Sequence, residues 1–325
     1  MSSLDGERLD RALALLTGLS RAEASRLVAA GKVRLGGEVV TSGSRRLRLG
    51  DPLVVHIPDG RERLGEDRSA PAAAIEARVV FADADLVVVD KPAGLVVHPG
   101  AGNPGGTLVQ QLVARFPDMA DAGPDSLRPG IVHRLDKGTS GLLVVARTPA
   151  AREGLARQMA AHATLRRYLA VVYGELPADE GVIEAPLGRS PRERRKVAVV
   201  EGGRPARTLY RVLGRTVSPL PATFLTCRLE TGRTHQVRAH LAAIGHPVLA
   251  DDRYASAAQV SLARKLVPAL DRPFLHAAEL GFVHPVTGEA MKWTSPLPPE
   301  LAQALSVLGL GHCLVPWDRE SLDAR

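Results

Sequence analysis

Aromatic residues are scarce in this chain. Its 325 residues include five phenylalanines, four tyrosines and two tryptophans, which together make up 3% of the sequence. Proteins that grip single-stranded nucleic acid by stacking bases on aromatic rings usually contain more of them. Any nucleic-acid binding by this chain is therefore expected to depend on arginine, lysine and the backbone, with very few rings at special positions.

Cysteines and long apolar segments are also lacking. The two cysteines, Cys227 and Cys313, lie far apart and form no Cys-x-x-Cys pattern, so the sequence indicates neither a disulfide framework nor a zinc site. No run of about 20 apolar residues is present, and the N-terminus lacks the basic-then-apolar pattern of a secretory signal. We therefore expect a reducing, cytoplasmic location and no membrane partner.

Positive charge is in excess. The chain has 42 lysines and arginines against 35 aspartates and glutamates, which gives a net charge of +7 and a sequence pI of about 9.8. This balance favours a polyanionic partner, with nucleic acid ahead of an anionic membrane surface. The hydrophobic fraction of 45% is enough for a substantial core, and the length predicts roughly two domains.

The first 57 residues predict a small domain of two helices and a short sheet. Apolar residues recur at helical spacing over 8–16, and Ser20 with Glu23 forms a capping-box pattern before a second helix that ends at Gly31. Short strand-like runs joined by tight turns follow. The block resembles the S4 RNA-binding module, although a small basic α+β domain with solvated charges would show a similar pattern.

The S4 resemblance implies that this domain binds RNA through basic side chains spread along its helices and their exit. These are Arg11, Arg21, Arg26 and Lys32. Residues 58–76 are first charged and then rich in alanine and proline, which is typical of a linker. We therefore expect an S4-like domain over residues 1–57, followed by a linker over residues 58–76.

A second, larger domain is expected over residues 77–307. Strand-like runs such as 86–89 and 168–173 mix with helical stretches such as 148–161, without a regular βαβ repeat. This order predicts an α+β domain with a mixed sheet rather than a doubly wound one. Residues 308–325 are expected to form a loosely held C-terminal tail.

The most informative segment runs from His133 to Gly141 and leads into the apolar run 142–146. It places Asp136 between Arg134 and a turn rich in hydroxyl groups, directly before a predicted strand. A carboxylate on a loop that a rigid sheet holds is well placed for covalent chemistry. Taken alone, the segment fits equally well a turn in which Asp136 pairs with Arg134 at the surface.

Strings elsewhere in the chain decide between these interpretations. His-Arg-Leu-Asp at 133–136 is followed by Arg-x-Tyr at 166–168 and by Gly-Arg-Thr-His-Gln-x-Arg-x-His at 232–240, with Lys-Pro at 91–92 ahead of them. In this order, over residues 77–300, they resemble the RluA family of RNA pseudouridine synthases. Taken together with the S4-like front end, these strings resemble the D-type branch, which acts on large-subunit ribosomal RNA.

The resemblance implies a fold and a reaction. The fold is the pseudouridine synthase fold, whose catalytic domain is α+β with a mixed, largely antiparallel sheet. The reaction converts uridine within an RNA chain to its C-glycoside isomer, after the target nucleotide has been extruded from the folded RNA. No metal, ATP or redox cofactor is needed, and the sequence has neither a P-loop nor a dinucleotide-binding fingerprint.

The resemblance also implies roles for individual residues. Asp136 matches the catalytic aspartate, although the sequence leaves open whether it attacks the ribose C1′, attacks the uracil ring or removes the C2′ proton. Arg233 matches the arginine that pairs with this aspartate and keeps it charged, and Tyr168 matches the tyrosine that stacks on the uracil. Arg134 is expected to fill the gap that the extruded base leaves. Apart from the resemblance, Thr139 is expected to fix the loop by hydrogen bonds to the backbone, as small hydroxyl residues do in turns.

Two further sets of polar residues allow either a ligand or a purely structural role. His133, His235 and His240 suggest a metal site, but no carboxylate ligand accompanies them, so we expect hydrogen-bonding roles and no metal. A basic run between the second and third strings either holds RNA phosphates or forms solvated surface. It consists of Arg189, Arg192, Arg194, Arg195 and Lys196.

One position departs from the family pattern. Where the family usually shows Gly-Asp, this chain has Ala250-Asp251, which leaves every chemical group present. A catalytically idle RNA-binding or ribosome-assembly protein is the main alternative, but it would have no reason to keep Asp136, Tyr168 and Arg233 together. A methyltransferase would need a glycine-rich loop after a strand, and none is present. We therefore predict a monomeric pseudouridine synthase whose partner is ribosomal RNA.

Overall fold

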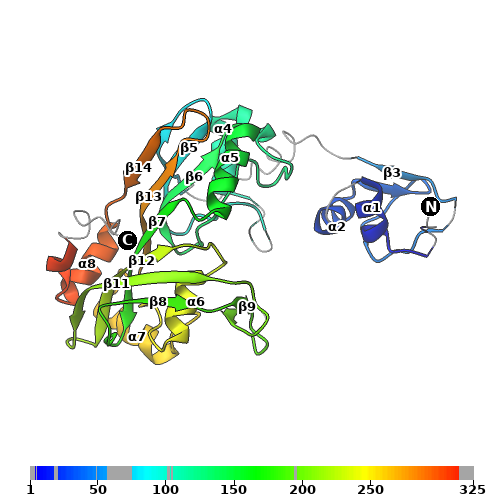
Figure 1. Cartoon of the computed structure of the whole chain (residues 1–325). Helices are drawn as coiled ribbons and strands as arrows, with labels where there is room; N and C mark the ends of the chain where they lie inside the picture. The colour runs from blue at the N-terminus through cyan, green and yellow to red at the C-terminus, as the bar shows by residue number, and fades with distance from the viewer. Residues whose placement is uncertain are drawn as a thin grey trace. The chain divides into compact units, whose positions relative to one another are not determined.

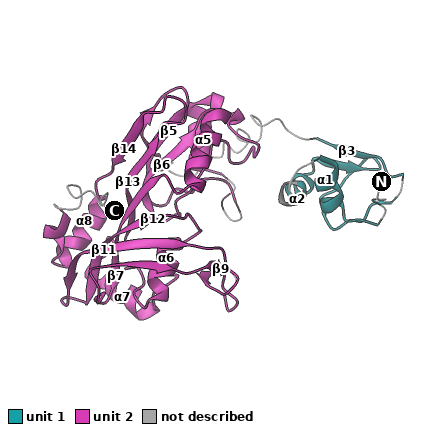
Figure 2. Cartoon of the chain, in the orientation of Figure 1, with its two compact units in different colours: residues 1–63 teal, residues 64–325 magenta. Residues whose placement is uncertain are grey.

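A computed structural model describes residues 4, 6–17, 21–48, 50–56, 75–100, 103, 105–193 and 196–314. The chain divides into two compact units, residues 1–63 and 64–325 (Figure 2). The division falls within the predicted linker, of which residues 58–74 lie outside the described part. Among the described residues, no helix is both long enough and apolar enough to cross a membrane.

The first unit consists of two helices and a small antiparallel sheet. Its elements are α1 (Leu9–Thr17), α2 (Arg21–Ala29), β1 (Val33–Leu35), β2 (Glu38–Val39) and β3 (Leu53–Val55), with the strands in the order β2-β1-β3. Leu9 and Leu13 of α1 are fully buried in its core. The chain turns away from α2 at Gly31, whose φ of +69° glycine adopts without strain. The capping box expected at Ser20 and Glu23 lies outside the described residues.

The second unit is built on a nine-stranded sheet, which confirms the expected α+β class. In spatial order the strands are β4 (Arg78–Ala82), β5 (Leu86–Lys91), β6 (Ser140–Ala146), β13 (Leu275–Val283), β7 (Leu165–Tyr173), β12 (Ala222–Leu229), β11 (Arg207–Thr216) and β8 (Glu180–Glu184), with β14 (Ala290–Thr294) paired to β13. Among these described strands, every pair is antiparallel except β6 with β13. A separate antiparallel pair joins β9 (Leu187–Arg189) and β10 (Val197–Val199).

The central strands of this sheet are apolar on both faces. All seven residues of β6 are buried, as expected for a strand that is covered on each side. Leu143 and Val145 pack in one cluster with α4 (Leu108–Arg115), whereas Leu142 and Val144 pack in another with α5 (Pro149–Ala160). Full burial of each such side chain contributes about 1.5–3 kcal/mol. The first cluster also receives side chains from α6 (Gln236–Ala243), α7 (Ala257–Leu266) and α8 (Pro299–Val307) (Figure 1).

The strand order brings distant segments of the chain together. β13 lies between β6 and β7, and the three strands run side by side through the unit (Figure 1). At the start of β6, Gly141 has a φ of +113°, and an added Cβ would lie 2.2 Å from the carbonyl oxygen of Ala277. Glycine is therefore needed for β6 to approach β13 directly after the loop that carries Asp136.

One predicted boundary is wrong. Residues 308–314 are not a loosely held tail, because Leu308, Leu310 and Cys313 are buried in the main core. A short 3-10 helix, Gly311–Leu314, follows α8 in this segment. These apolar side chains gain free energy by packing onto the core, which a prediction based on nearness to the chain end does not consider. Residues 315–325 lie outside the described part of the chain.

Candidate active site

Backbone hydrogen bonds hold the loop that carries Asp136. The Thr139 N–H donates to the carbonyl oxygen of Asp136 at 3.0 Å, and the Gly94 N–H donates to that of Lys137 at 2.7 Å. Thr139 and Ser140 are both buried where the loop enters β6. Thr139 therefore braces this loop through its backbone, and the carboxylate of Asp136 stands on a fixed turn.

Asp136 pairs with Arg238 of α6. Arg238 Nη1 lies 3.1 Å from Asp136 Oδ2, while Arg238 Nε and Nη2 bind the two carboxylate oxygens of the fully buried Asp251 at 2.6 and 2.7 Å. Burial lowers the pKa of Arg238, but the hydrogen bonds and charge of Asp251, and then those of Asp136, outweigh it and raise the pKa above its ordinary value. The guanidinium is therefore charged, and it forms a charge-assisted hydrogen bond with Asp136.

The expected ion pair between Arg233 and Asp136 is wrong. Arg233 Nε donates to the carbonyl oxygen of Pro205 at 3.1 Å, although the side chain lines the same pocket as Asp136. The chain changes direction between the two arginines of the 232–240 string, because His235 adopts a left-handed conformation with a φ of +54° at the start of α6. This turn places Arg238, and not Arg233, against the carboxylate.

Tyr168 and Arg134 line the same pocket as Asp136. Burial raises the pKa of the Tyr168 phenol to about 12, so this ring is neutral at pH 7. Arg134 Nη1 lies 3.3 Å from His98 Nε2, and the described structure forms no surface pair between Arg134 and Asp136. The site therefore brings together Asp136, Tyr168, Arg134 and Arg233 from the sequence analysis, and adds Arg238 as the partner of the carboxylate.

His235 approaches the carboxylate from its other side. Its Nε2 lies 3.8 Å from Asp136 Oδ1, and its Nδ1 lies 3.1 Å from the Tyr254 hydroxyl. That hydroxyl donates its proton to the carbonyl oxygen of Val197 at 2.9 Å, so it must accept a proton from Nδ1–H. Neutral His235 thus carries its proton on Nδ1 and directs the lone pair of Nε2 toward Asp136. Burial lowers the pKa of His235, against the opposing charge of Asp136.

A buried lysine lies close to the loop, and the sequence analysis assigned it no role. Lys91 is fully buried at the end of β5, and its Nζ donates to the carbonyl oxygens of Pro92 and Leu95 at 2.8 and 2.9 Å. Burial, reinforced by the charge of Arg272, lowers the pKa of Lys91 to about 7. In the sequence, Lys91 stood out only as part of the Lys-Pro string at 91–92. Asp251 stood out only as the second residue of the Ala250-Asp251 pair, which departs from the family pattern at its first position.

The other two histidines make the hydrogen bonds that the sequence analysis expected. His133 Nε2 accepts the N–H of Val144 at 3.1 Å, and burial lowers the pKa of this ring to about 3. His240 Nδ1 lies 2.9 Å from the Thr208 hydroxyl, and its Nε2 lies 3.0 Å from the carbonyl oxygen of Ala185. Both rings therefore brace the strands beside the site.

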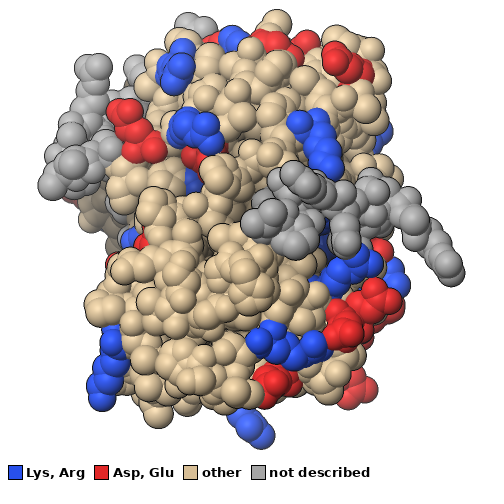
Figure 3. All heavy atoms as spheres, turned by 90° about the vertical axis from the view of Figure 1, so that its left-hand side faces the viewer, with Lys and Arg blue, Asp and Glu red and all other residues tan. Residues whose placement is uncertain are grey.

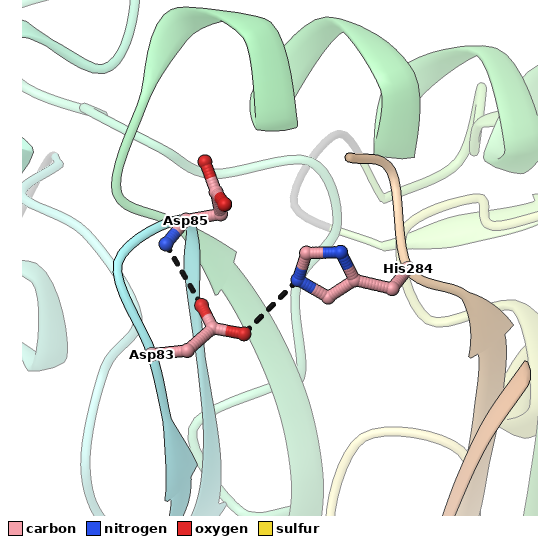
Figure 4. Close-up of side chains that lie close together, drawn as sticks. All are labelled: Asp83, Asp85 and His284. Carbon is pink, nitrogen blue, oxygen red and sulfur yellow. Dashed lines mark hydrogen bonds and ion pairs between the residues drawn. The ribbon is translucent and has the colours of Figure 1, made fainter. Parts of the chain in front are cut away.

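The described residues contain one group with the spacing of metal ligands, Asp83, Asp85 and His284, whose ligand atoms all lie within 4.8 Å of one another (Figure 4). Asp83 Oδ1 accepts the N–H groups of Asp85 and Leu86, both at 2.8 Å, and its Oδ2 lies 3.0 Å from His284 Nε2. His284 Nδ1 accepts the Thr287 N–H at 3.0 Å, so the ring proton is on Nε2 and points at Asp83. This cluster ties the turn between β4 and β5 to the end of β13.

The predicted RNA-binding residues of the first unit lie on or after its helices. Arg11 and Arg26 are exposed on α1 and α2, and Lys32 is half-buried after Gly31. Arg11 pairs with Glu7 at 3.3 Å. The side chain of Arg21 lies outside the described residues. RNA binding by these side chains stays a prediction.

The predicted basic run lies at the β9–β10 pair. Arg189 and Arg192 are exposed, and Arg194 and Arg195 lie outside the described residues. The Nζ of Lys196 lies 5.0 Å from the ring centre of Tyr254, which in turn bonds to His235. Lys196 therefore reaches the edge of the candidate active site through Tyr254.

Comparison with known proteins confirms both resemblances. The RNA pseudouridylate synthase family model matches residues 85–243, and the S4 domain model matches residues 7–53. A Zymomonas mobilis protein named ribosomal large subunit pseudouridine synthase D is 42% identical over 310 residues, which cover 94% of this chain and 95% of that protein. The protein of the same name from Nitrosomonas europaea is 47% identical over 74% of this chain and 68% of its own length.

A solved structure agrees with these relatives. The structure of human RNA Pseudouridylate Synthase Domain Containing 1 matches with a TM-score of 0.56 and 28% identity, covering 72% of this chain and 90% of that one. The family model spans the loop of Asp136, the strand of Tyr168 and the helix of Arg238. On the sequence match to relatives along nearly its whole length and on its fold, this chain belongs to the RNA pseudouridine synthase family.

Proposed function

We propose that this chain converts uridine to pseudouridine in large-subunit ribosomal RNA, with Asp136 as the catalytic carboxylate. The relatives at 42% and 47% identity carry the large ribosomal subunit in their names, and the S4 match and the net charge of +7 suit an RNA substrate. The observation that carries the proposal is the pairing of Asp136 with Arg238 in the same pocket as the buried Tyr168.

The ionised form of Asp136 is the reactive one. The isomerisation breaks the N1–C1′ bond, forms a C5–C1′ bond, releases the C5 proton and returns a proton to N1, so it needs no oxidant or reductant. Attack on C1′, attack on the ring and removal of the C2′ proton each use a lone pair of the carboxylate. Arg238, itself held by Asp251, stabilises that form, although the side chain of Asp136 is only 14% exposed.

Tyr168 would stack on the extruded uracil, and Arg134 would fill the place that the uracil leaves in the RNA. A uridine within folded RNA has to be extruded before its C1′ becomes accessible, which costs a few kcal/mol. The neutral Tyr168 ring offers an apolar face on which uracil stacks. The described structure gives Arg134 one side-chain bond, to the ring of His98, whose pKa burial lowers. Its planar guanidinium can therefore move into the vacated place in the RNA stack without breaking an ion pair.

The test is tritium release from C5 of labelled uridine in a large-subunit ribosomal RNA transcript. We expect Asp136→Asn to lose roughly 1,000-fold or more of this activity while still binding the transcript. Glu289→Gln, in the exposed turn between β13 and β14, is the matched control and should retain full turnover. Full turnover by Asp136→Asn would contradict the proposal, whereas wild-type binding without any tritium release would indicate an idle RNA-binding protein.

A further inference from the structure

A hollow lined by arginines adjoins the pocket of Asp136. Its volume is about 480 Å³, and His133, Arg134, Arg166 and Arg233 belong to the walls of both. Five guanidinium groups and a single carboxylate, that of Asp125, line this arginine hollow. The arginines are Arg128, Arg134, Arg152, Arg166 and Arg233.

Most of these charges lack an acidic partner among the residues that the structure describes. Arg128 lies 3.7 Å from Asp125, while Arg134 bonds to the ring of His98 and Arg233 bonds to a backbone carbonyl. Among the described residues, no ion pair joins a carboxylate to Arg134, Arg152, Arg166 or Arg233. On the face drawn in Figure 3, by contrast, lysines and arginines are interspersed with aspartates and glutamates. The arginine hollow therefore carries a concentrated excess of positive charge.

Arg166 is the buried arginine of this hollow whose hydrogen bonding is incomplete. It is only 5% exposed, and its Nε has no hydrogen-bond partner among the described residues. Its Nη2 donates to the carbonyl oxygens of Glu230 and Leu229, and burial lowers its pKa. A Cβ added at Gly232 would lie 2.8 Å from Arg166 Nη1, so a glycine covers this guanidinium. A buried cation without a counter-charge is unfavourable, and an anion entering the hollow would relieve it.

We propose that the arginine hollow binds the phosphate backbone of the RNA strand next to the extruded uridine. Arg166 would be the inner phosphate ligand, and Arg128 and Arg152 the outer ones. The forked guanidinium matches phosphate oxygens in pairs. The described lining contains no tyrosine, tryptophan or phenylalanine on which a base could stack, so recognition there is through the backbone and independent of sequence. This inference rests on the proposed function, because it takes RNA as the substrate.

The two helix arginines Arg152 and Arg157 provide a matched test. Both lie on α5, but Arg152 lines the hollow, whereas Arg157 is 68% exposed and pairs with Glu153. We would measure Kd for a large-subunit ribosomal RNA transcript as a function of salt. Arg152→Gln should raise Kd roughly threefold or more and reduce the slope of log Kd against log salt by about 0.7, the value for one contact to a single strand. Arg128→Gln should do the same, and Arg157→Gln should change neither quantity.

Two further measurements complete the test: the dependence of binding on the RNA sequence, and the effect of replacing the buried Arg166. The loss in Arg152→Gln should be equal for the native transcript and for a scrambled transcript of the same length, because a phosphate contact does not read bases. Arg166→Lys, which keeps the charge but loses the fork, should raise Kd while its thermal unfolding shows that it folds. An unchanged salt slope in both Arg128→Gln and Arg152→Gln, or a loss confined to the native transcript, would overturn the proposal. Tritium release by the wild type, measured in parallel, shows independently whether the proposed function holds.

Discussion

The Nε2 of His235 lies 3.8 Å from Oδ1 of Asp136 and presents a lone pair to that carboxylate, since the ring proton is committed to Tyr254 through Nδ1. Two electron-rich atoms therefore face each other when His235 is neutral. A proton that binds at Nε2 turns the ring into a cation that faces the carboxylate. The other charged or titratable groups around His235 are Arg238, Asp251, Arg253 and Tyr254.

This arrangement predicts an acidic limb in the pH profile. Burial holds the pKa of His235 below its usual 6.5, so the ring is neutral at pH 7 and becomes protonated as the pH falls. Protonated His235 would pair with Asp136 and make the carboxylate less reactive. Single-turnover rates should therefore decline on the acidic side. In His235→Asn, whose amide can still donate to Tyr254, this decline should move to lower pH.

The control for this experiment is His312→Asn, which removes an exposed histidine of the C-terminal 3-10 helix. It should keep the wild-type profile. If His235→Asn also followed the wild-type profile, the acidic limb would have to come from another group.

Exchanging the arginines of the 232–240 string tests which of them supports the carboxylate. Arg238→Gln removes the positive charge that pairs with Asp136 and should lower the single-turnover rate roughly 100-fold or more at saturating RNA. It also leaves Asp251 buried without its partner, which should cost about 3–5 kcal/mol of unfolding free energy. Arg233→Gln keeps the Arg238–Asp136 pair and should change this rate less than roughly tenfold.

A double variant separates stability from catalysis at this pair. Arg238→Gln with Asp251→Asn removes both buried charges, so it should regain most of the stability lost in Arg238→Gln but none of the turnover. Urea unfolding and single-turnover rates measure the two effects. A larger kinetic loss in Arg233→Gln than in Arg238→Gln would reverse the assignment made from the structure.

His276 predicts a pH-dependent stability of the second unit. Its Nε2–H donates to the carbonyl oxygen of Ser295, its Nδ1 accepts from the Ser140 hydroxyl, and burial lowers its pKa to about 4. The unfolded chain takes up this proton near pH 6.5, so the stability contribution is complete above that pH and is lost as the pH falls toward 4. The slope is up to about 1.4 kcal/mol per pH unit.

The variant His276→Gln checks this slope, because glutamine can still donate to Ser295 but does not titrate. Its unfolding free energy in urea, measured at pH 7, 6 and 5, should fall less steeply than that of the wild type. Parallel slopes would show that His276 does not carry the effect.

Ala250 occupies a conformation that favours glycine, with a φ of +58°, and its methyl group is buried. Relief of left-handed strain in Ala250→Gly is worth about 1–2 kcal/mol. Loss of the buried methyl group and the greater entropy of glycine in the unfolded chain cost about the same. The unfolding free energy should therefore stay within about 0.5 kcal/mol of the wild type.

The matched comparison is Ala263→Gly, a buried alanine within α7. There the lost methyl group and the lower helix propensity of glycine add to a cost of about 2 kcal/mol, with no strain to relieve. Equal losses in the two variants, measured by chemical denaturation, would show that Ala250 is not strained.

Short sequence motifs predicted which residues form the candidate site better than they predicted which of those residues contact one another. The loop of Asp136, the strand of Tyr168 and the helix of the 232–240 string follow from turn residues, apolar runs and spacing. The choice between Arg233 and Arg238 does not, because it depends on the left-handed turn at His235. The strand order could not be predicted from such motifs either. β13 lies between β6 and β7 in the sheet, although more than a hundred residues of sequence separate it from both.

Charge patterns were the weakest guide. The basic run at 189–196 stood out in the sequence, and the arginine hollow did not, because its five members come from segments far apart in the chain. The proposed role of Arg166 depends on its burial, and the burial of an arginine cannot be predicted from its residue type. The packing of residues 308–314 was missed for the same reason, because it depends on the core surface that they meet.

The place of β13 in the sheet also sets when during synthesis the enzyme becomes active. This strand separates β6 from β7, yet the ribosome makes it last of the three, at residues 275–283. A nascent chain stalled before residue 275 already contains Asp136, Tyr168 and Arg238, but the two strands that position the first two have no partner between them. The fold therefore requires β13 before the site can form, and truncation before residue 275 should abolish activity while Asp136, Tyr168 and Arg238 all remain in the chain.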